Sequence, residues 1–318
     1  MKITQKDINP FKNTDSNKRY LTMDYHMRGV FGKKACKVPI DGGFTCPNRD
    51  GTKGIGGCTF CSASGSGDFT AGRELGITAQ IDKGAQMMRR KWQDAVLIPY
   101  FQSYTSTYAP LSVLKERFSE ALAHRDASGI CIATRPDCIN EEIAEYLTQL
   151  SREHFLMLEL GLQTTFDETA ERINRGYTYE EFLKGYRLVK HLFVCVHLIN
   201  GLPGESREMM VENARRLAEL KPSAVKLHLL HVIKGTRLAE QYLSGEADVM
   251  SLEGYVETVC DQLEVLPPDT VIERVTGDGS ADTLLAPAWS KKKLVVQNEI
   301  DKLLFARNSW QGMRYKQT

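Results

Sequence analysis

The feature that most constrains the fold of this chain is a regular alternation of two kinds of segment from residue 78 onward. Short, almost wholly apolar runs alternate with amphipathic stretches at a period of about 30 residues, which predicts buried strands followed by surface helices. After a first strand at 37–40, the predicted strands are 95–98, 130–133, 155–162, 192–199 and 225–230, and helices are predicted to begin near Thr78, Pro110, Asn140, Thr178 and Ser206. We therefore predict an α/β fold of roughly six βα units around a parallel sheet.

Two arrangements of such units are open. Right-handed crossovers can curl the strands into a partial (β/α)6 TIM-type barrel, or lay them out as an open, doubly wound sheet. Both arrangements collect functional residues at the carboxyl ends of the strands. Residues 241–318 break the alternation and predict an α+β extension with a helix at 255–266, a strand at 271–275 and a long helix from Lys291. The expected organisation is an N-terminal segment (1–33), the barrel (34–240) and a C-terminal extension (241–318) packed on it.

Composition narrows the functional classes. The 318 residues are 42% hydrophobic and 25% charged, as in ordinary globular proteins, and the net charge of +1 shows no global basicity that would indicate nucleic acid. The runs 33–34, 89–91 and 291–293 are candidates for local basic patches, although solvated helix faces are the more common explanation of such runs.

The sequence also indicates the compartment. No apolar run approaches the ~18 residues of a membrane span, and residues 1–7 lack the hydrophobic stretch of a signal peptide. Eight cysteines without an export signal favour thiols or metal ligands over disulfides. We expect a cytoplasmic protein with no membrane partner.

Three of these cysteines, Cys46, Cys58 and Cys61, stand in a glycine-rich stretch after the first predicted strand. A structural zinc ion needs four protein ligands, so Cys36 or His26 would have to complete that site. An iron–sulfur cubane held by three thiolates keeps one iron open for a small molecule. The spacing alone leaves both readings open.

The same stretch carries a family resemblance. Residues 46–61, with Phe60 before the last cysteine, resemble the cysteine loop of the radical S-adenosylmethionine (SAM) superfamily, although eleven residues separate Cys46 from Cys58 where three are usual. With this longer spacing the loop resembles that of the YtqA/YhcC group, which is related to Elongator catalytic-subunit-like proteins. Five further segments resemble that group in the same order: 100–107, 133–137, 159–163, 173–176 and 200–205.

This resemblance implies a partial barrel of the radical SAM kind and two cofactors. Cys46, Cys58 and Cys61 would ligate a [4Fe-4S] cluster, and S-adenosyl-L-methionine would bind its open iron and be cleaved reductively to a 5′-deoxyadenosyl radical. An electron donor such as flavodoxin or ferredoxin is implied as well. The zinc reading becomes remote on this resemblance.

Strand ends supply the candidate SAM contacts, each with a structural alternative. Thr134 and Arg135 end the third strand, where Arg135 suits either a ligand carboxylate or a structural ion pair. Glu159 and Gln163 suit ribose hydroxyls, and Arg175 suits a salt bridge to that site or to the SAM carboxylate. The remaining candidates are Phe60, Gln102, Ser103 and Thr105, Gly201 at the expected adenine motif, and His231 after the sixth strand.

Three functions were weighed. The resemblance implies an enzyme that acts on tRNA at the wobble uridine, converting a carboxymethylaminomethyl side chain to aminomethyl on the route to 5-methylaminomethyl-2-thiouridine. The near-neutral charge favours a small metabolite or protein side chain as substrate instead. A non-catalytic, metal-stabilised interaction protein is the third reading. Trp289 beside the lysine run 291–293 is a candidate RNA surface, with a packed tryptophan as the alternative.

Overall fold

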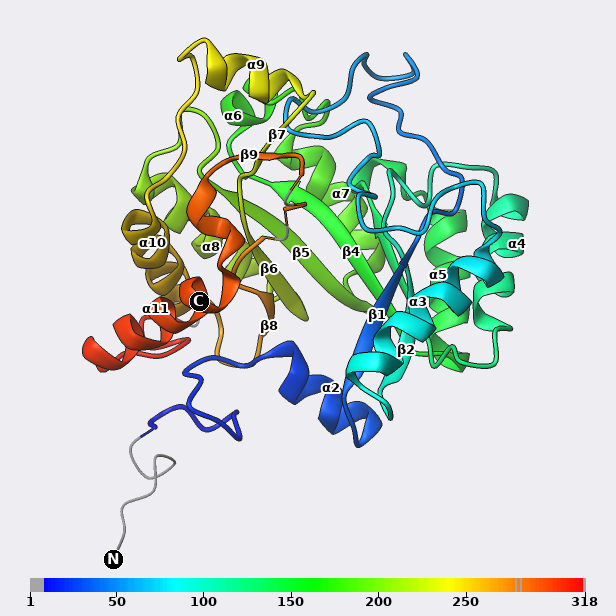
Figure 1. Cartoon of the computed structure of the whole chain (residues 1–318), viewed down its shortest axis with the longest axis horizontal. Helices are drawn as coiled ribbons and strands as arrows, with labels where there is room; N and C mark the ends of the chain where they lie inside the picture. Colours follow the sequence, from blue (N-terminus) through cyan, green and yellow to red (C-terminus); the bar gives the residue numbers. More distant parts are fainter. Residues whose placement is uncertain (1–8, 278, 281, 317–318) are drawn as a thin grey trace, which may run out of the picture. The chain divides into compact units, whose positions relative to one another are not determined.

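A computed structural model describes residues 9–277, 279–280 and 282–316 of this chain. Seven strands form the main sheet in the order β1-β2-β3-β4-β5-β6-β8 (Figure 1). Their bounds are β1 Ala35–Ile40, β2 Val96–Phe101, β3 Ile130–Thr134, β4 Leu156–Gln163, β5 Phe193–Asn200, β6 Ala224–Leu229 and β8 Val271–Arg274. The recorded pairings of β1 with β2, β2 with β3, β3 with β4 and β6 with β8 are all parallel.

This strand order decides between the two predicted arrangements. A doubly wound sheet reverses its strand order at a switch point, whereas here each of the first six strands lies beside its neighbours in sequence. The chain is therefore singly wound, as in a barrel. The seventh strand, β8, was predicted as part of the C-terminal extension, and it joins the same sheet beside β6.

Contacts between residues divide the chain into two compact units, which are described separately. The unit that contains the cysteine loop comprises Met27–Leu162 and Asn174–Cys195. Helix α3 packs on β1, α4 packs on β3 and on α3, and α5 contacts α7. The helices of this unit are the end of α2 (Met23–Phe31), α3 Ile77–Lys91, α4 Leu111–Leu122, the 3-10 turn η1 Pro136–Cys138, α5 Glu141–Glu153 and α7 Tyr179–Val189.

The other unit comprises residues up to His26, Gln163–Ile173 and Val196 to the C-terminus. In it α10 packs against both α8 and α11, and a small antiparallel ribbon pairs β7 with β9. Its elements are α6 Asp167–Arg172, α8 Arg207–Leu220, β7 Val232–Ile233, α9 Arg237–Leu243, α10 Leu252–Val265, β9 Leu284–Ala286, η2 Ala288–Lys291 and α11 Lys293–Ala306.

Local sequence signals set most helix starts. The side chains of Asn140, Thr178 and Ser206 each accept a backbone hydrogen bond as N-caps, and Thr178 with Glu181 forms the predicted capping box. Pro110 is the N-cap of α4 rather than its first helical residue. The long helix predicted from Lys291 begins instead at Lys293, after the turn η2. Among the described residues, no helix has the length and apolarity needed to cross a membrane.

Candidate functional site

The three cysteines lie in a loop that begins after β1 ends at Ile40. The carbonyl of Cys46 accepts the backbone N–H groups of Arg49 at 2.8 Å and Asp50 at 3.2 Å, and the N–H of Cys61 bonds to the carbonyl of Cys58 at 3.0 Å. Gly57, just before Cys58, has φ of +78°, a conformation that favours glycine. Two tight turns thus bracket the sequence between the first and last thiols.

The thiols are half-buried and influence one another electrostatically. Burial raises the pKa of Cys58 to about 12, and the neighbouring Cys61 and Cys46 raise it further. Burial also raises the pKa of Cys61, while Arg49 opposes that rise and Cys46 adds to it. Ligation to a cluster requires all three groups as thiolates, and the positive charge of the cluster's irons would offset the repulsion between them.

Two side chains of the loop place hydrogen-bond donors around these sulfurs. The amide of Asn48 donates to Cys58 Sγ at 3.9 Å and to the Asn174 carbonyl at 2.5 Å. The guanidinium of Arg49 donates to the carbonyls of Cys61 at 3.0 Å and Ser62 at 2.6 Å. Donors beside thiolates suit an iron–sulfur cluster, whose potential such bonds tune.

Three thiol side chains in one loop fit a [4Fe-4S] cluster that keeps one iron open for a small molecule. Across residues 9–277, 279–280 and 282–316, no three His, Cys, Asp or Glu side chains are grouped to hold one metal ion. A [4Fe-4S] cluster binds its protein thiolates at different irons, so its ligands do not converge on one point. We propose Cys46, Cys58 and Cys61 as its ligands.

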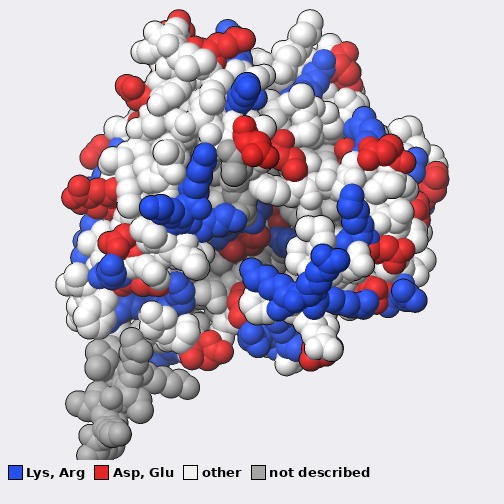
Figure 2. Space-filling view, viewed as in Figure 1, with Lys and Arg blue, Asp and Glu red and all other residues white. Residues whose placement is uncertain are grey.

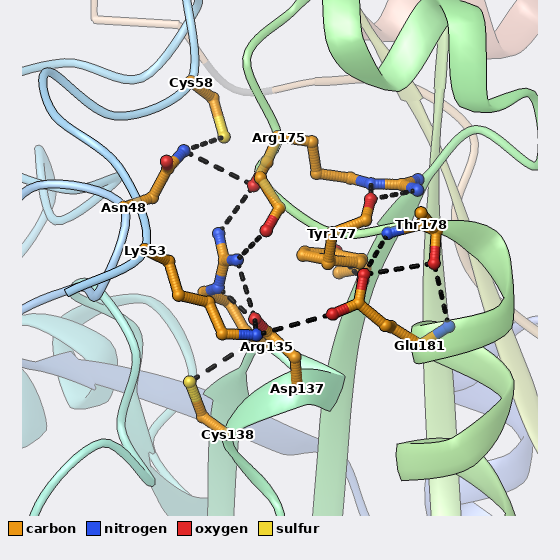
Figure 3. Close-up of polar contacts among 12 residues, drawn as sticks. Asn48, Lys53, Cys58, Arg135, Asp137, Cys138, Arg175, Tyr177, Thr178 and Glu181 are labelled. Atoms are coloured by element: carbon orange, nitrogen blue, oxygen red, sulfur yellow. Dashed lines mark hydrogen bonds and ion pairs between the residues drawn. The ribbon is translucent and has the colours of Figure 1, made fainter.

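A polar network ties this loop to the ends of β3 and β4 (Figure 3). Lys53, from the cysteine loop, pairs with Asp137 at 2.7 Å, and Asp137 also pairs with Arg135 at 2.9 Å. Both cations lower the pKa of Asp137 despite its burial. The long excursion between Cys46 and Cys58 is therefore anchored by charge as well as by backbone turns.

The network gives Arg135 and Arg175 defined partners. The Arg135 fork binds Asp137 at 3.0 and 2.9 Å, which is the structural ion pair of the two alternatives, and its third nitrogen donates to the Arg175 carbonyl at 2.8 Å. The guanidinium of Arg175, fully buried, donates to the Tyr177 carbonyl at 3.0 and 2.7 Å. Both guanidinium groups hold the segment between α6 and α7 in place.

Glu159 lies on β4 with none of its surface exposed. Its carboxylate pairs with Lys37 of β1 and accepts a hydrogen bond from the Tyr100 hydroxyl at 2.6 Å. The sequence predicts that a charged glutamate inside an apolar strand needs a partner, and side chains from β1 and β2 are those partners. Glu159 remains a proposed ribose contact, in which the ligand would share this carboxylate with Lys37 and Tyr100.

Two of the candidates that follow β2 are hydrogen-bonded to residues on either side of the cysteine loop. Gln102 donates to the Ser66 carbonyl at 2.8 Å, and the Thr105 N–H donates to the Thr45 carbonyl at 3.2 Å. Ser103 is buried, and its hydroxyl lacks a hydrogen-bond partner among the described residues. An unpaired buried hydroxyl is costly, so Ser103 is the candidate best suited to bind a ligand. Thr134 bonds to Thr107 at 2.6 Å, and Phe60 is half-buried.

Three predicted residues belong to the other unit. Gln163 ends β4 with φ of +64°, and Gly201 follows β5 with φ of +87°. His231 is 8% exposed and its Nε2 atom lacks a partner among the described residues. Its ring lies 5.8 Å from that of His228, edge to face. Burial and the nearby Arg274 and Lys293 lower the pKa of His231 to about 4, so it is neutral at pH 7.

Sequence reasoning missed the residues that brace the loop: Asn48, Arg49, Lys53, Asp137 and Tyr177. It also missed Cys138, which lies near enough to Cys46 to interact electrostatically and whose pKa burial raises to about 12. Four of these residues stand inside the quoted segments 46–61 and 133–137, but their type alone gives no signal. A lysine and an aspartate that pair across 84 positions are found only when the chain is folded.

Comparisons with known proteins show which family this chain resembles. A family model described as the Radical SAM superfamily matches residues 46–217, and one described as the Radical_SAM C-terminal domain matches residues 222–305. YtqA from Bacillus subtilis is 47% identical over 96% of this chain and 95% of its own length. A tRNA uridine(34) acetyltransferase from Methanocaldococcus jannaschii is 30% identical over 54% of this chain, but only 32% of its own length is matched.

Among solved structures, the archaeal Elp3 of Methanocaldococcus infernus with an N-terminal deletion superposes with a TM-score of 0.64. The sequences are 18% identical, and the match covers 85% of this chain and 63% of the other. Similarity at that identity reports on the fold alone. It confirms the α/β partial barrel that the family resemblance implies.

Proposed function

Because this chain belongs to the radical SAM superfamily, we propose that it acts on tRNA as a wobble-uridine-modifying member of that family. Enzymes of the family use a [4Fe-4S] cluster and SAM, and together these supply a carbon-centred radical that removes an unactivated hydrogen atom. The chain is accordingly an enzyme. The proposal concerns its substrate and the residues that serve the cofactors.

The support for tRNA comes from relatives that share the barrel. A protein named tRNA uridine(34) acetyltransferase aligns with 54% of this chain, and a protein named Elongator complex protein 3 aligns with 47%. We propose that a carboxymethylaminomethyl side chain at uridine 34 is converted to aminomethyl: the carbon between nitrogen and the carboxylate would lose a hydrogen atom to the 5′-deoxyadenosyl radical and one electron to the oxidised cluster, and water would hydrolyse the resulting imine, breaking the C–N bond and releasing the two carbons as glyoxylate. A C–H bond beside nitrogen resists acid and base catalysis, which is why a radical suits this step.

The chain's own residues would bind, orient and exclude water. Cys46, Cys58 and Cys61 would hold the cluster, with Asn48 and Arg49 donating hydrogen bonds around it. The unpaired hydroxyl of Ser103 would bind the cofactor. Phe60, Gln102, Thr105, Thr134, Glu159, Gln163, Gly201 and His231 remain proposed contacts, and Arg135 and Arg175 are proposed to act by holding the segment between α6 and α7. The reductant is proposed to be a flavodoxin or ferredoxin.

The observation that carries the cofactor assignment is the loop of three half-buried, interacting thiols with hydrogen-bond donors beside them. Anaerobic reconstitution tests it: the wild type should bind about four irons per chain and form 5′-deoxyadenosine from SAM after reduction. Cys58→Ala should lose the cluster's absorption and EPR signals, whereas Cys260→Ala, a buried cysteine elsewhere, should retain them. Retention of the cluster by Cys58→Ala would refute the ligand assignment.

The substrate is tested separately. tRNA from a strain lacking this gene should accumulate carboxymethylaminomethyluridine at position 34, as measured by nucleoside mass spectrometry. An unchanged nucleoside profile, with 5′-deoxyadenosine still formed in vitro, would leave the radical chemistry intact and reject tRNA. That result would favour a small metabolite or a protein side chain as substrate.

A further inference from the structure

Two basic runs far apart in sequence meet around one exposed tryptophan. The Val96 N–H bonds to the Lys34 carbonyl at 2.8 Å, at the edge where Ala35 of β1 pairs with Val96 of β2. The ammonium groups of Lys34 and Lys91 lie 4.5 Å and 5.4 Å from the ring centroid of Trp92. Trp92 is 39% exposed. We call residues 33–34 and 89–92 the Trp92 patch.

The patch carries a local excess of positive charge. Lys33, Arg90 and Lys91 are exposed, while Arg89 is paired with Asp126 at 2.5 Å. Figure 2 shows Lys and Arg side chains gathered in the area that α2 and the end of α3 occupy in Figure 1. Because the whole chain has a net charge of only +1, this gathering is a property of the patch and not of the surface in general. A clustered basic surface attracts polyanions.

From this arrangement we propose that the Trp92 patch binds the phosphate backbone of RNA. Lysines and arginines neutralise phosphates, and an exposed indole beside two ammonium groups can contact a base or ribose. The inference rests on the proposed function only in taking that RNA to be tRNA. It adds a second contact surface to the enzyme, separate from the cysteine loop.

The position of the patch fixes its role. It lies at the start of β1, whereas the cysteine loop follows the end of this six-residue strand, so the two are about 20 Å apart at ~3.3 Å per residue. The patch therefore contacts the body of the tRNA and not the nucleoside that reacts. Contacts to phosphate set affinity and orientation without reading sequence.

The test removes three exposed charges together, in Lys33→Gln/Arg90→Gln/Lys91→Gln. Binding of an unmodified tRNA transcript is measured for the full chain by fluorescence anisotropy at several salt concentrations. We expect the affinity to fall at least about tenfold at 0.1 M salt and the slope of log K against log salt to become shallower by about 2 to 3. Transcripts with uridine or cytidine at position 34 should lose affinity by the same factor.

The matched control, Lys184→Gln/Arg187→Gln/Lys190→Gln, removes three exposed charges from α7 and its C-cap and should bind tRNA as the wild type does. Equal losses of tRNA affinity in both triple variants would overturn the proposal, and so would an unchanged salt slope in the patch variant. It would also be overturned if the patch variant lost binding to phosphatidylserine vesicles while its tRNA affinity stayed intact.

These outcomes are separable from those of the proposed function. The patch variant should still form 5′-deoxyadenosine from SAM when no RNA is present, because the cysteine loop is untouched. If the nucleoside profile of the deletion strain were unchanged while the patch variant lost RNA affinity, the substrate assignment would fail and the RNA surface would stand.

Discussion

At the scale of single residues, the site is governed by where each charged group finds its partner. Glu159 is wholly buried, and its carboxylate is satisfied by Lys37 and by the Tyr100 hydroxyl. Breaking a buried ion pair by removing one member leaves the other charge uncompensated, which costs far more than removing both. The pair therefore joins β1, β2 and β4 and makes the strand ends below the cysteine loop mutually dependent.

Glu159→Gln is expected to lower the free energy of unfolding by about 3 kcal/mol, because the Lys37 ammonium loses its counter-charge. Lys37→Met should cost a similar amount for the reciprocal reason. The double variant should recover much of the loss in a urea-unfolding cycle. Strictly additive effects would show that the two groups do not stabilise each other.

Asn48 is expected to tune the proposed cluster through its bond to the Cys58 sulfur. Removing a donor to sulfur disfavours the reduced, more negative state, so Asn48→Ala should lower the reduction potential by tens of millivolts, roughly. Potentiometric titration followed by EPR measures it. The control Asn174→Gly removes a bond from the Asn174 side chain to the Gly57 carbonyl at 2.7 Å but no sulfur contact, and its potential should stay at the wild-type value.

At the scale of elements, close approach of backbones overrides helix propensity. Gly185 of α7 faces η1 so closely that a Cβ atom there would lie 2.1 Å from the Pro136 carbonyl oxygen. Gly29 of α2 has nothing within 4 Å of the same position. The same residue type is thus required in one helix and dispensable in the other.

Gly29→Ala is expected to stabilise the protein by about 0.5–1 kcal/mol, since alanine is the better helix former. Gly185→Ala should destabilise it, because the clash with a backbone carbonyl exceeds that gain. Thermal unfolding of the two variants in parallel measures the contrast. A raised midpoint for Gly185→Ala would mean that α7 and η1 separate easily.

At the scale of the whole molecule, acid stability depends on two buried histidines. The pKa of His231 is lowered to about 4 by burial and by Arg274 and Lys293, and that of His228 is lowered well below its usual 6.5 by burial and by Arg274. A base whose pKa is depressed on folding binds more protons when unfolded. Stability is therefore full above the unfolded pKa of about 6.5 and is lost as the pH falls from there towards 4.

The His231 contribution to this loss is expected to reach about 3 kcal/mol between pH 6.5 and 4. His231→Gln, which does not titrate, should lose correspondingly less stability over that interval than the wild type. Urea unfolding of both proteins at pH 7.5, 5.5 and 4.5 gives the comparison. Parallel pH dependences would indicate that folding does not lower the pKa of His231.

Much of the fold could be predicted from the sequence. Strand and helix order, the caps at Asn140, Thr178 and Ser206, and the cysteine loop were readable from the sequence, because each depends on residues a few positions apart. The singly wound sheet order could not be chosen by periodicity, since both candidate arrangements bury the same apolar strands. The comparison with YtqA adds the family but not the partners of individual side chains.

What the sequence determined by itself is the set of local signals: which segments are apolar, where helices start, and that three thiols share one glycine-rich loop. Only the tertiary structure decided that the Arg135 fork binds Asp137, that Lys53 reaches back to the same carboxylate, and that two basic runs meet at Trp92. The physical reason is that secondary structure follows from short-range sterics and periodic burial. The partner of a charged side chain is set by which distant strands the sheet brings together.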